Sequence, residues 1–166
     1  MAASLPGLSE WRRLIDYRVY QIQKLPNVEL IKNTRLNADE VLAYGANIVV
    51  MANGSHWAAD GFNHVTRAPI EGHHLSHVFT PEGVLLRNAK IGERVLVYYC
   101  DGHIMGSGLA ERFARAGHRV TLITPLAKIA QYTDQTLDSP DFRRTLRDLG
   151  IEMLTSVRLD EITESE

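Results

Sequence analysis

The sequence predicts an α/β fold with a parallel sheet, and three observations lead to that prediction. Between residues 94 and 154, apolar β-rich runs alternate with helical patterns, as they do in βαβ units. The apolar run over residues 48–52 does not alternate with polar residues, which is typical of a parallel strand covered on both faces. Gly117 and Gly150 follow the helical patterns, at positions where glycine commonly ends a helix.

The first part of the chain predicts two helices and a strand. Ser9 can cap a helix over residues 11–22, whose apolar side chains recur at helical spacing. Residues 28–31 are a short strand candidate, since they are mostly apolar and follow a proline. Asn37 and Glu40 have the spacing of a capping box and predict the start of a second helix.

The rest of the chain is predicted as a long connection followed by the βαβ region. Residues 53–79 have weak periodicity and contain five of the seven histidines, so we expect a connection there. Thr80 and Pro81 predict the start of a short helix that runs to about residue 87. Strands are then predicted over 94–99, 119–124 and 151–154 and helices over 105–116 and 141–149, with 158–162 as a candidate fourth strand.

Composition excludes several classes of protein. The chain has 166 residues, 45% of them hydrophobic and 23% charged, which suffices for one domain or two small ones. Eighteen basic residues against twenty acidic ones leave no basic excess, so we expect no nucleic-acid partner. No apolar run reaches transmembrane length and the start does not resemble a signal peptide. We therefore expect a cytoplasmic protein with no membrane partner.

Metal and thiol chemistry are not expected. Cys100 is the only cysteine, so it cannot form an intrachain disulfide or a multi-cysteine metal site. Asp101 beside it would raise the thiol pKa, which argues against a nucleophile. The histidines of residues 53–79 lack a carboxylate–histidine helical motif, so we interpret them as solvated loop residues. No catalytic residue and no metal ligand is predicted.

The strongest candidate site is a dinucleotide-binding turn. A strand, a turn, a helix and a strand within about thirty residues indicate a Rossmann-like three-layer domain, whose turn is expected to carry Gly-x-Gly-x-x-Gly. The spacing aligns Gly106 with the third glycine. Gly102, Met105 and Gly106 are therefore the candidate cofactor-binding residues of this turn.

The turn departs from the motif at its first two glycines, where Asp101 and His103 stand. The β-carbon of His103 would obstruct the approach of a pyrophosphate, and an ionised Asp101 would repel it. Thr124 occupies the end of the second strand, where an acidic residue usually holds a ribose hydroxyl. We therefore predict a nucleotide-binding type of fold that has lost its ligand.

A second candidate site follows the apolar run 48–52. The sequence Ala52-Asn53-Gly54 is similar to the Ala-Thr-Gly that ends a strand in flavin-dependent disulfide reductases. Gly54 would allow the chain to turn close to a cofactor. Asn53, Gly54 and Ser55 are therefore candidate remnants of a nucleotide site.

Several segments together resemble one family. The resemblance covers nearly the whole chain and is to the C-terminal region of the trimethylamine dehydrogenase family. That family includes dimethylamine and histamine dehydrogenases and, more distantly, dienoyl-CoA reductase. The segments that carry the resemblance are residues 5–11, 16–18, 38–42, 44–46, 48–57, 102–106 and 109–111.

The resemblance implies that this chain matches only part of a longer protein. Family members carry FMN and a 4Fe-4S cluster in an N-terminal barrel, followed by an FAD-like domain, which holds ADP in the amine dehydrogenases, and an NADPH-like domain. By this resemblance, residues 1–80 are a partial FAD-like segment with a connection, and residues 81–166 are a nearly complete NAD(P)-binding-like domain. The barrel and the glycine-rich turn of the ADP site have no counterpart here, so we expect no cofactor in this chain.

The resemblance leads to one main functional hypothesis and two alternatives. The main one is a fragment of an amine dehydrogenase-type oxidoreductase that acts as a scaffold, is inactive alone, and whose parent passes electrons to an electron-transfer flavoprotein. The alternatives are an NAD(P)H-binding module of a dienoyl-CoA-reductase-like enzyme and a non-enzymatic interaction domain from a truncated gene. Because the strand at 48–52 would leave an unpaired apolar edge, we also expect a homo-oligomer.

Overall fold

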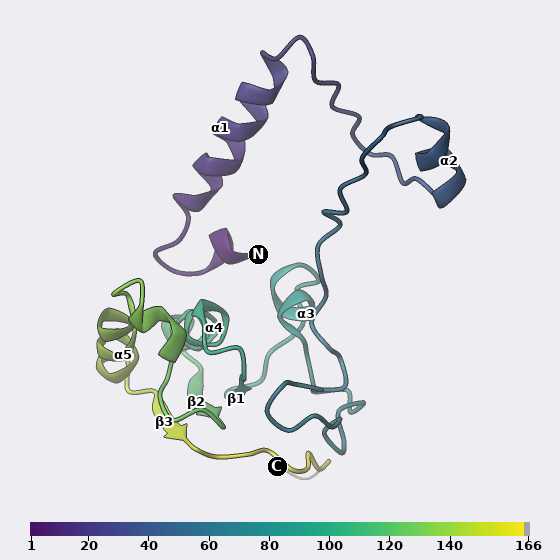
Figure 1. Ribbon diagram of the computed structural model, residues 1–166. Coiled ribbons are helices and arrows are strands. Elements are labelled where there is room, and N and C mark those ends of the chain that lie inside the picture. Colours follow the sequence, from purple (N-terminus) through teal and green to yellow (C-terminus); the bar gives the residue numbers. More distant parts are fainter. Residues whose placement is uncertain (165–166) are drawn as a thin grey trace. The chain divides into compact units, whose positions relative to one another are not determined.

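The computed structural model describes residues 1–164 (Figure 1). The chain divides into two compact units, one made of residues 1–10 together with residue 56 onward, and a smaller one made of residues 11–55. This division into units does not test the domain boundary predicted between residues 80 and 81, which stays a prediction.

The larger unit is built on a parallel sheet of three strands: β1 (Arg94–Tyr98), β2 (Arg119–Thr124) and β3 (Glu152–Thr155), in the order β1-β2-β3. These segments are rich in Val, Ile, Leu and Thr, which favour a pleated and half-buried surface. The register places Val97 opposite Leu122, and Leu122 opposite Met153. The predicted α/β fold with a parallel sheet is therefore confirmed.

Two helices connect the strands and pack beside one another (Figure 1). Helix α4 (Ile104–Arg115) joins β1 to β2 and packs on both, and helix α5 (Ser139–Asp148) joins β2 to β3. Each helix is followed by a glycine with positive φ, at Gly117 and Gly150, which confirms the predicted helix ends. The core between helices and sheet consists of Leu5, Val97, Tyr99, Leu109, Ala110, Phe113, Val120, Leu122, Ile129, Ala130, Leu146 and Ile151.

The N-terminal residues and a third helix complete the larger unit. The short 3-10 helix η1 (Ala2–Ser4) precedes Leu5, which is 3% exposed and packs against Gly108 of α4. The Arg112 guanidinium donates to the carbonyl of Ser4 at 3.0 Å. Helix α3 (Pro81–Leu85) begins as predicted, with the Thr80 hydroxyl accepting a hydrogen bond from the Gly83 N–H.

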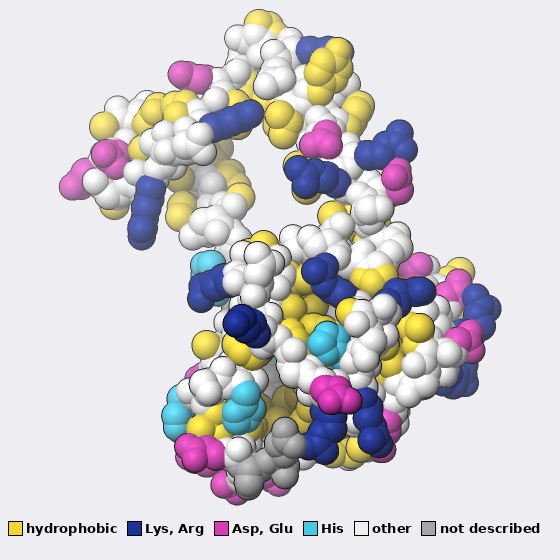
Figure 2. All heavy atoms as spheres, turned by 180° about the vertical axis from the view of Figure 1, so that it is seen from behind, with side chains coloured by type: hydrophobic (Ala, Val, Ile, Leu, Met, Phe, Trp, Pro, Cys, Tyr) yellow, Lys and Arg dark blue, Asp and Glu magenta, His cyan; other side chains and the backbone are white. Residues whose placement is uncertain are grey.

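The smaller unit contains helices α1 (Trp11–Gln23) and α2 (Ala38–Ala43), and neither helix has a buried residue. The predicted capping box is present, since Asn37 Oδ1 accepts from the Glu40 N–H and Glu40 Oε2 accepts from the Asn37 N–H. Apolar side chains therefore lie at the surface over this unit (Figure 2).

Both strands predicted in the first part of the chain are wrong. Residues 28–31 and 48–52 form no strand in the structure. Ile48 and Val50 are each 81% exposed. A strand needs a neighbouring strand to bond its backbone N–H and C=O groups, and the smaller unit provides none for these segments. The segment is apolar, as its sequence states, but the sequence does not show whether another strand lies beside it.

The candidate fourth strand over residues 158–162 is also not formed. A single parallel bridge joins Glu71 to Glu161 there, with the Ile162 N–H donating to the carbonyl of Glu71. The segment before the bridge is fixed to the sheet, because the Val157 N–H donates to the carbonyl of Thr124. No helix among residues 1–164 is long and apolar enough to cross a membrane.

Candidate functional site

The predicted turn lies between β1 and α4, and the chain itself covers it. Gly102 has a φ of +65°, which favours glycine, and its carbonyl accepts a hydrogen bond from the Tyr132 N–H at 3.0 Å. A β-carbon on Gly102 would lie 2.6 Å from Tyr132 Cδ2 and 2.9 Å from Leu126 Cδ1. Two side chains from the segment after β2 therefore pack directly against the turn.

Tyr132 is held in this position by local structure. It lies in the short 3-10 helix η2 (Gln131–Asp134), which begins after Ala130 with a left-handed φ of +51°. Its ring also packs against the ring of His103, with the two centroids 5.3 Å apart. The aromatic side chain of Tyr132 thus lies against the turn, and its backbone N–H is bonded to the same turn.

Gly106 allows α4 to pack closely on the end of the strand, as the third glycine of the motif would. A β-carbon there would lie 2.3 Å from Tyr99 Cγ, so only glycine fits beside this ring. The Tyr99 hydroxyl accepts a hydrogen bond from the Ala130 N–H at 2.5 Å. Burial raises the pKa of Tyr99 to about 12, so the phenol stays neutral and serves as a structural acceptor. Met105, the third candidate of this turn, is a partly buried neighbour of the core.

Asp101 and His103 occupy the first two motif positions. His103 is the N-cap residue of α4, but its side chain makes no capping hydrogen bond. Asp101 Oδ1 is buried with no hydrogen-bond partner among residues 1–164. Burial raises the pKa of Asp101, and the charges and N–H groups nearby, chiefly those of His103, lower it only in part. The net effect favours the protonated carboxyl more than in a solvated aspartate.

The second candidate site, Asn53 to Ser55, lies in the smaller unit and is exposed. Gly54 has a φ of +75°, and a β-carbon there would meet no atom within 4 Å. The glycine conformation suits a turn, while a role of Asn53, Gly54 and Ser55 in binding a cofactor stays a prediction.

The cysteine lies in the interior, whereas His56, His64, His74 and His77 are exposed. Cys100 is buried, and burial is the main cause that raises the pKa of its thiol, with Asp101 adding to the effect. His56 Nδ1 lies 3.9 Å from Glu82 Oε1, which also accepts the Trp57 N–H at 3.0 Å. Burial alone would raise the pKa of Glu82, but hydrogen bonds with the backbones of Trp57 and Glu82 and with the Thr80 side chain, together with the nearby His56, hold it below its usual value. Among residues 1–164, no group of three His, Cys, Asp or Glu side chains could hold a metal ion.

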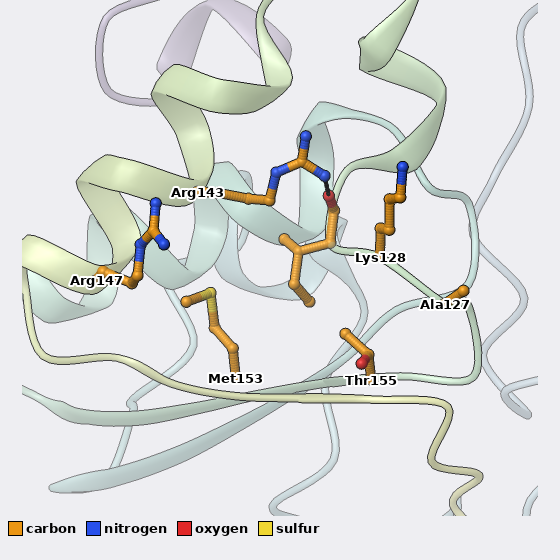
Figure 3. A pocket seen from close by; sticks show the side chains of 7 residues that line it. Ala127, Lys128, Arg143, Arg147, Met153 and Thr155 are labelled. Atoms are coloured by element: carbon orange, nitrogen blue, oxygen red, sulfur yellow. Dashed lines mark hydrogen bonds between the residues drawn. The ribbon is translucent and has the colours of Figure 1, made fainter.

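Sequence reasoning missed a pocket between α5, β3 and the segment after β2 (Figure 3). Its volume is about 250 Å³. The residues that line it are Ala127, Lys128, Ile129, Arg143, Arg147, Met153 and Thr155. The sequence offered one clue, since Arg143 and Arg147 are four residues apart and therefore share a face of a helix.

Comparisons with known proteins place the chain in a defined group. A family model described as the OYE-like second alpha/beta domain matches residues 79–166. Dimethylamine dehydrogenase of Hyphomicrobium sp. (strain x) is 40% identical over 159 residues, which are 92% of this chain and 22% of that protein.

Two solved structures share the fold over most of the chain. The 6-hydroxypseudooxynicotine amine oxidase of Pseudomonas geniculata N1 has a TM-score of 0.89 at 35% identity, over 98% of this chain and 24% of that one. Histamine dehydrogenase of Rhizobium sp. 4-9 has a TM-score of 0.83 at 36% identity, over 93% of this chain and 24% of that one. The chain thus spans about a quarter of these relatives, and the resemblance to the trimethylamine dehydrogenase family is confirmed.

Proposed function

Because this chain belongs to the family of the OYE-like second alpha/beta domain, we propose that it is a scaffold segment related to amine dehydrogenase-type oxidoreductases, with a closed dinucleotide turn. By this proposal its Rossmann-like domain keeps the strand–turn–helix geometry but takes neither NADH nor NADPH. The chain alone has no amine dehydrogenase activity, since the redox groups that the resemblance implies lie outside the matched region.

The observation that carries the proposal is the packing of Tyr132 and Leu126 on Gly102. A bound pyrophosphate has to approach the glycine turn and the start of the following helix. The Tyr132 ring lies so close to Gly102 that a β-carbon on this glycine would be only 2.6 Å from it. A phosphate therefore cannot reach the same backbone without displacing η2. The bond from the Tyr132 N–H to the Gly102 carbonyl would then break as well.

Two further features support a closed site. The half-buried Asp101 carboxyl belongs to the turn, and in its ionised form a charge within about 5 Å of a phosphate costs roughly 3 kcal/mol at an effective dielectric of about 20, while burial favours the neutral form. Thr124 at the end of β2 is fully buried and offers no carboxylate to a ribose. Each of these features weakens nucleotide binding independently of Tyr132.

Calorimetry with NADH and NADPH tests the proposal. We expect dissociation constants above about 1 mM for the unmodified chain, against about 10 μM for an intact site. Combining Tyr132→Ala with His103→Gly should tighten binding at least tenfold, because it frees the space above Gly102. Tyr132→Phe is the matched control and should change nothing, since it keeps the ring and the backbone bond.

The measurement also separates the proposal from its main alternative. A dissociation constant in the low micromolar range for the unmodified chain would overturn the closed turn and favour an NAD(P)H-binding module. Equal weak binding by the double variant and by Tyr132→Phe would show that Tyr132 is not what closes the site.

A further inference from the structure

We propose that the pocket between α5 and β3 binds a phosphate monoester that carries a small apolar group. The site shares no lining residue with the turn at residues 100–106, so the proposal does not depend on whether the turn binds a nucleotide. It rests on the charge of the pocket wall, the fixed position of one guanidinium and the apolar character of the opposite wall.

The wall of the pocket is positively charged, although the whole chain has a net charge of −2. Lys128, Arg143 and Arg147 all line it (Figure 3). Asp134 compensates only part of this charge, since it pairs with Arg143 at 2.8 Å and with Lys128 at 3.5 Å. Among residues 1–164, Arg147 forms no ion pair with an acidic side chain. An anion with two negative charges would complete the balance.

Arg143 is already held in a fixed position before any ligand binds. Its Nη2 donates to Asp134 Oδ1 at 2.8 Å and to Ser139 Oγ at 2.6 Å, and its Nη1 donates to the Ile129 carbonyl at 3.3 Å. The Ser139 hydroxyl in turn donates to Asp134. A guanidinium has five N–H donors, so two remain for a ligand.

Arg143 and Arg147 together suit a phosphate headgroup. They lie four residues apart on α5, so both guanidinium groups reach the same side of the helix (Figure 3). The planar fork of arginine matches phosphate oxygens in pairs, and a compact ammonium such as that of Lys128 adds a point charge beside it.

The opposite wall is mostly apolar, with one hydroxyl from Thr155, and it determines the second part of the ligand. Met153 and Thr155 face the basic side chains from β3 (Figure 3). Ile129, which is 3% exposed, also lines the pocket. A volume of about 250 Å³ is too small for a dinucleotide but holds a single ring with its phosphate. The pocket therefore selects a small amphipathic anion rather than a bare ion.

Titration of the full chain with phenyl phosphate, followed by amide NMR shifts, tests the site. We expect saturation with a dissociation constant below about 1 mM and the largest shifts at Met153 and Thr155. Arg147→Gln should weaken binding at least tenfold. Arg144→Gln is the matched control on the same helix, because Arg144 is exposed, pairs with Asp141 and does not line the pocket. Arg144→Gln should change the dissociation constant for phenyl phosphate by less than about twofold.

Each other outcome contradicts a stated part of the proposal. No saturation by 5 mM, or equal weakening by Arg147→Gln and Arg144→Gln, overturns the site. Inorganic phosphate that binds as tightly as phenyl phosphate overturns the apolar part and shows an anion site only. Benzyl alcohol that binds as tightly overturns the role of the charges, since it presents the ring without the phosphate.

Discussion

Replacing Gly106 with alanine should lower the free energy of unfolding of the larger unit, because the structure leaves no room for a β-carbon there. The added atom would lie 2.3 Å from Tyr99 Cγ, 2.5 Å from its Cδ2 and 2.7 Å from its Cβ. A rotamer change moves the Tyr99 ring but leaves its Cβ in place, so the backbone would also have to shift. Tyr99 is 6% exposed, and its hydroxyl accepts the Ala130 N–H.

The expected loss follows from three contributions. Overpacking a core costs about 1–3 kcal/mol, and the upper end applies because the contact is so short. Shifting the ring also loosens the bond from Ala130, which is worth about 1 kcal/mol. Alanine recovers about 1 kcal/mol over glycine in a helix. The net expectation for Gly106→Ala is therefore a loss of about 3 kcal/mol in the free energy of unfolding.

Urea unfolding followed by near-ultraviolet circular dichroism measures this loss. With an m-value of about 2 kcal/mol/M, the midpoint should fall by about 1.5 M. Gly83→Ala is the control, because a β-carbon there would lie 3.6 Å from the Phe79 side chain, an ordinary contact. Its midpoint should stay or rise. A Gly106→Ala protein whose midpoint matches that of the unmodified chain would refute the argument from packing.

Three further predictions concern the core, the turn and the smaller unit. Leu146 is 1% exposed, so Leu146→Ala should cost about 2–5 kcal/mol in urea unfolding, while Leu137→Ala at an 81% exposed site should cost less than about 0.5 kcal/mol. The pKa of Asp101 is higher in the folded chain than in the unfolded chain. Its contribution to stability is therefore complete at a pH below the unfolded-state pKa and is lost as the pH rises through the folded-state pKa. Asp101→Asn should therefore gain stability relative to the unmodified chain between pH 4 and pH 7, and a difference that does not change with pH contradicts this. The exposed run at 48–52 should bind a second copy of the chain, so light scattering should give a mass above 18.6 kDa. Val50→Lys should lower this mass, and a monomeric mass for the unmodified chain would contradict the prediction.

Elements specified by local chemistry could be predicted from the sequence. The capping box at Asn37 and Glu40 and the start at Thr80 each depend on residues three positions apart, and both form as expected. Strand β2 has the predicted bounds, Arg119–Thr124, because its apolar residues lie between a glycine and a proline that limit it on both sides. Gly106 could also be assigned, since the motif spacing states which position must pack closely.

The cover on the turn could not be predicted in the same way. Tyr132 contacts Gly102 across thirty residues of sequence, and η2 is too short to show periodicity. The departures at Asp101 and His103 indicated that the turn had changed, but not what filled the space. The basic pocket was missed for a similar reason, because it joins three elements that are separated in the sequence.

The two units differ in whether they supply their own neighbours, and this difference accounts for the strands that form between residues 94 and 155 and for the two early candidates that do not. The larger unit pairs every predicted strand between residues 94 and 155 with another strand of the same unit and closes a core around them. The smaller unit has apolar runs of the same kind, yet its helices bury no residue and its strand candidates have no partner within it. An apolar pattern therefore predicts the need for a neighbour, and only the rest of the fold decides whether that need is met. Residues 48–52 are the place where this need is left open, which is why we expect their exposure to control association of the chain.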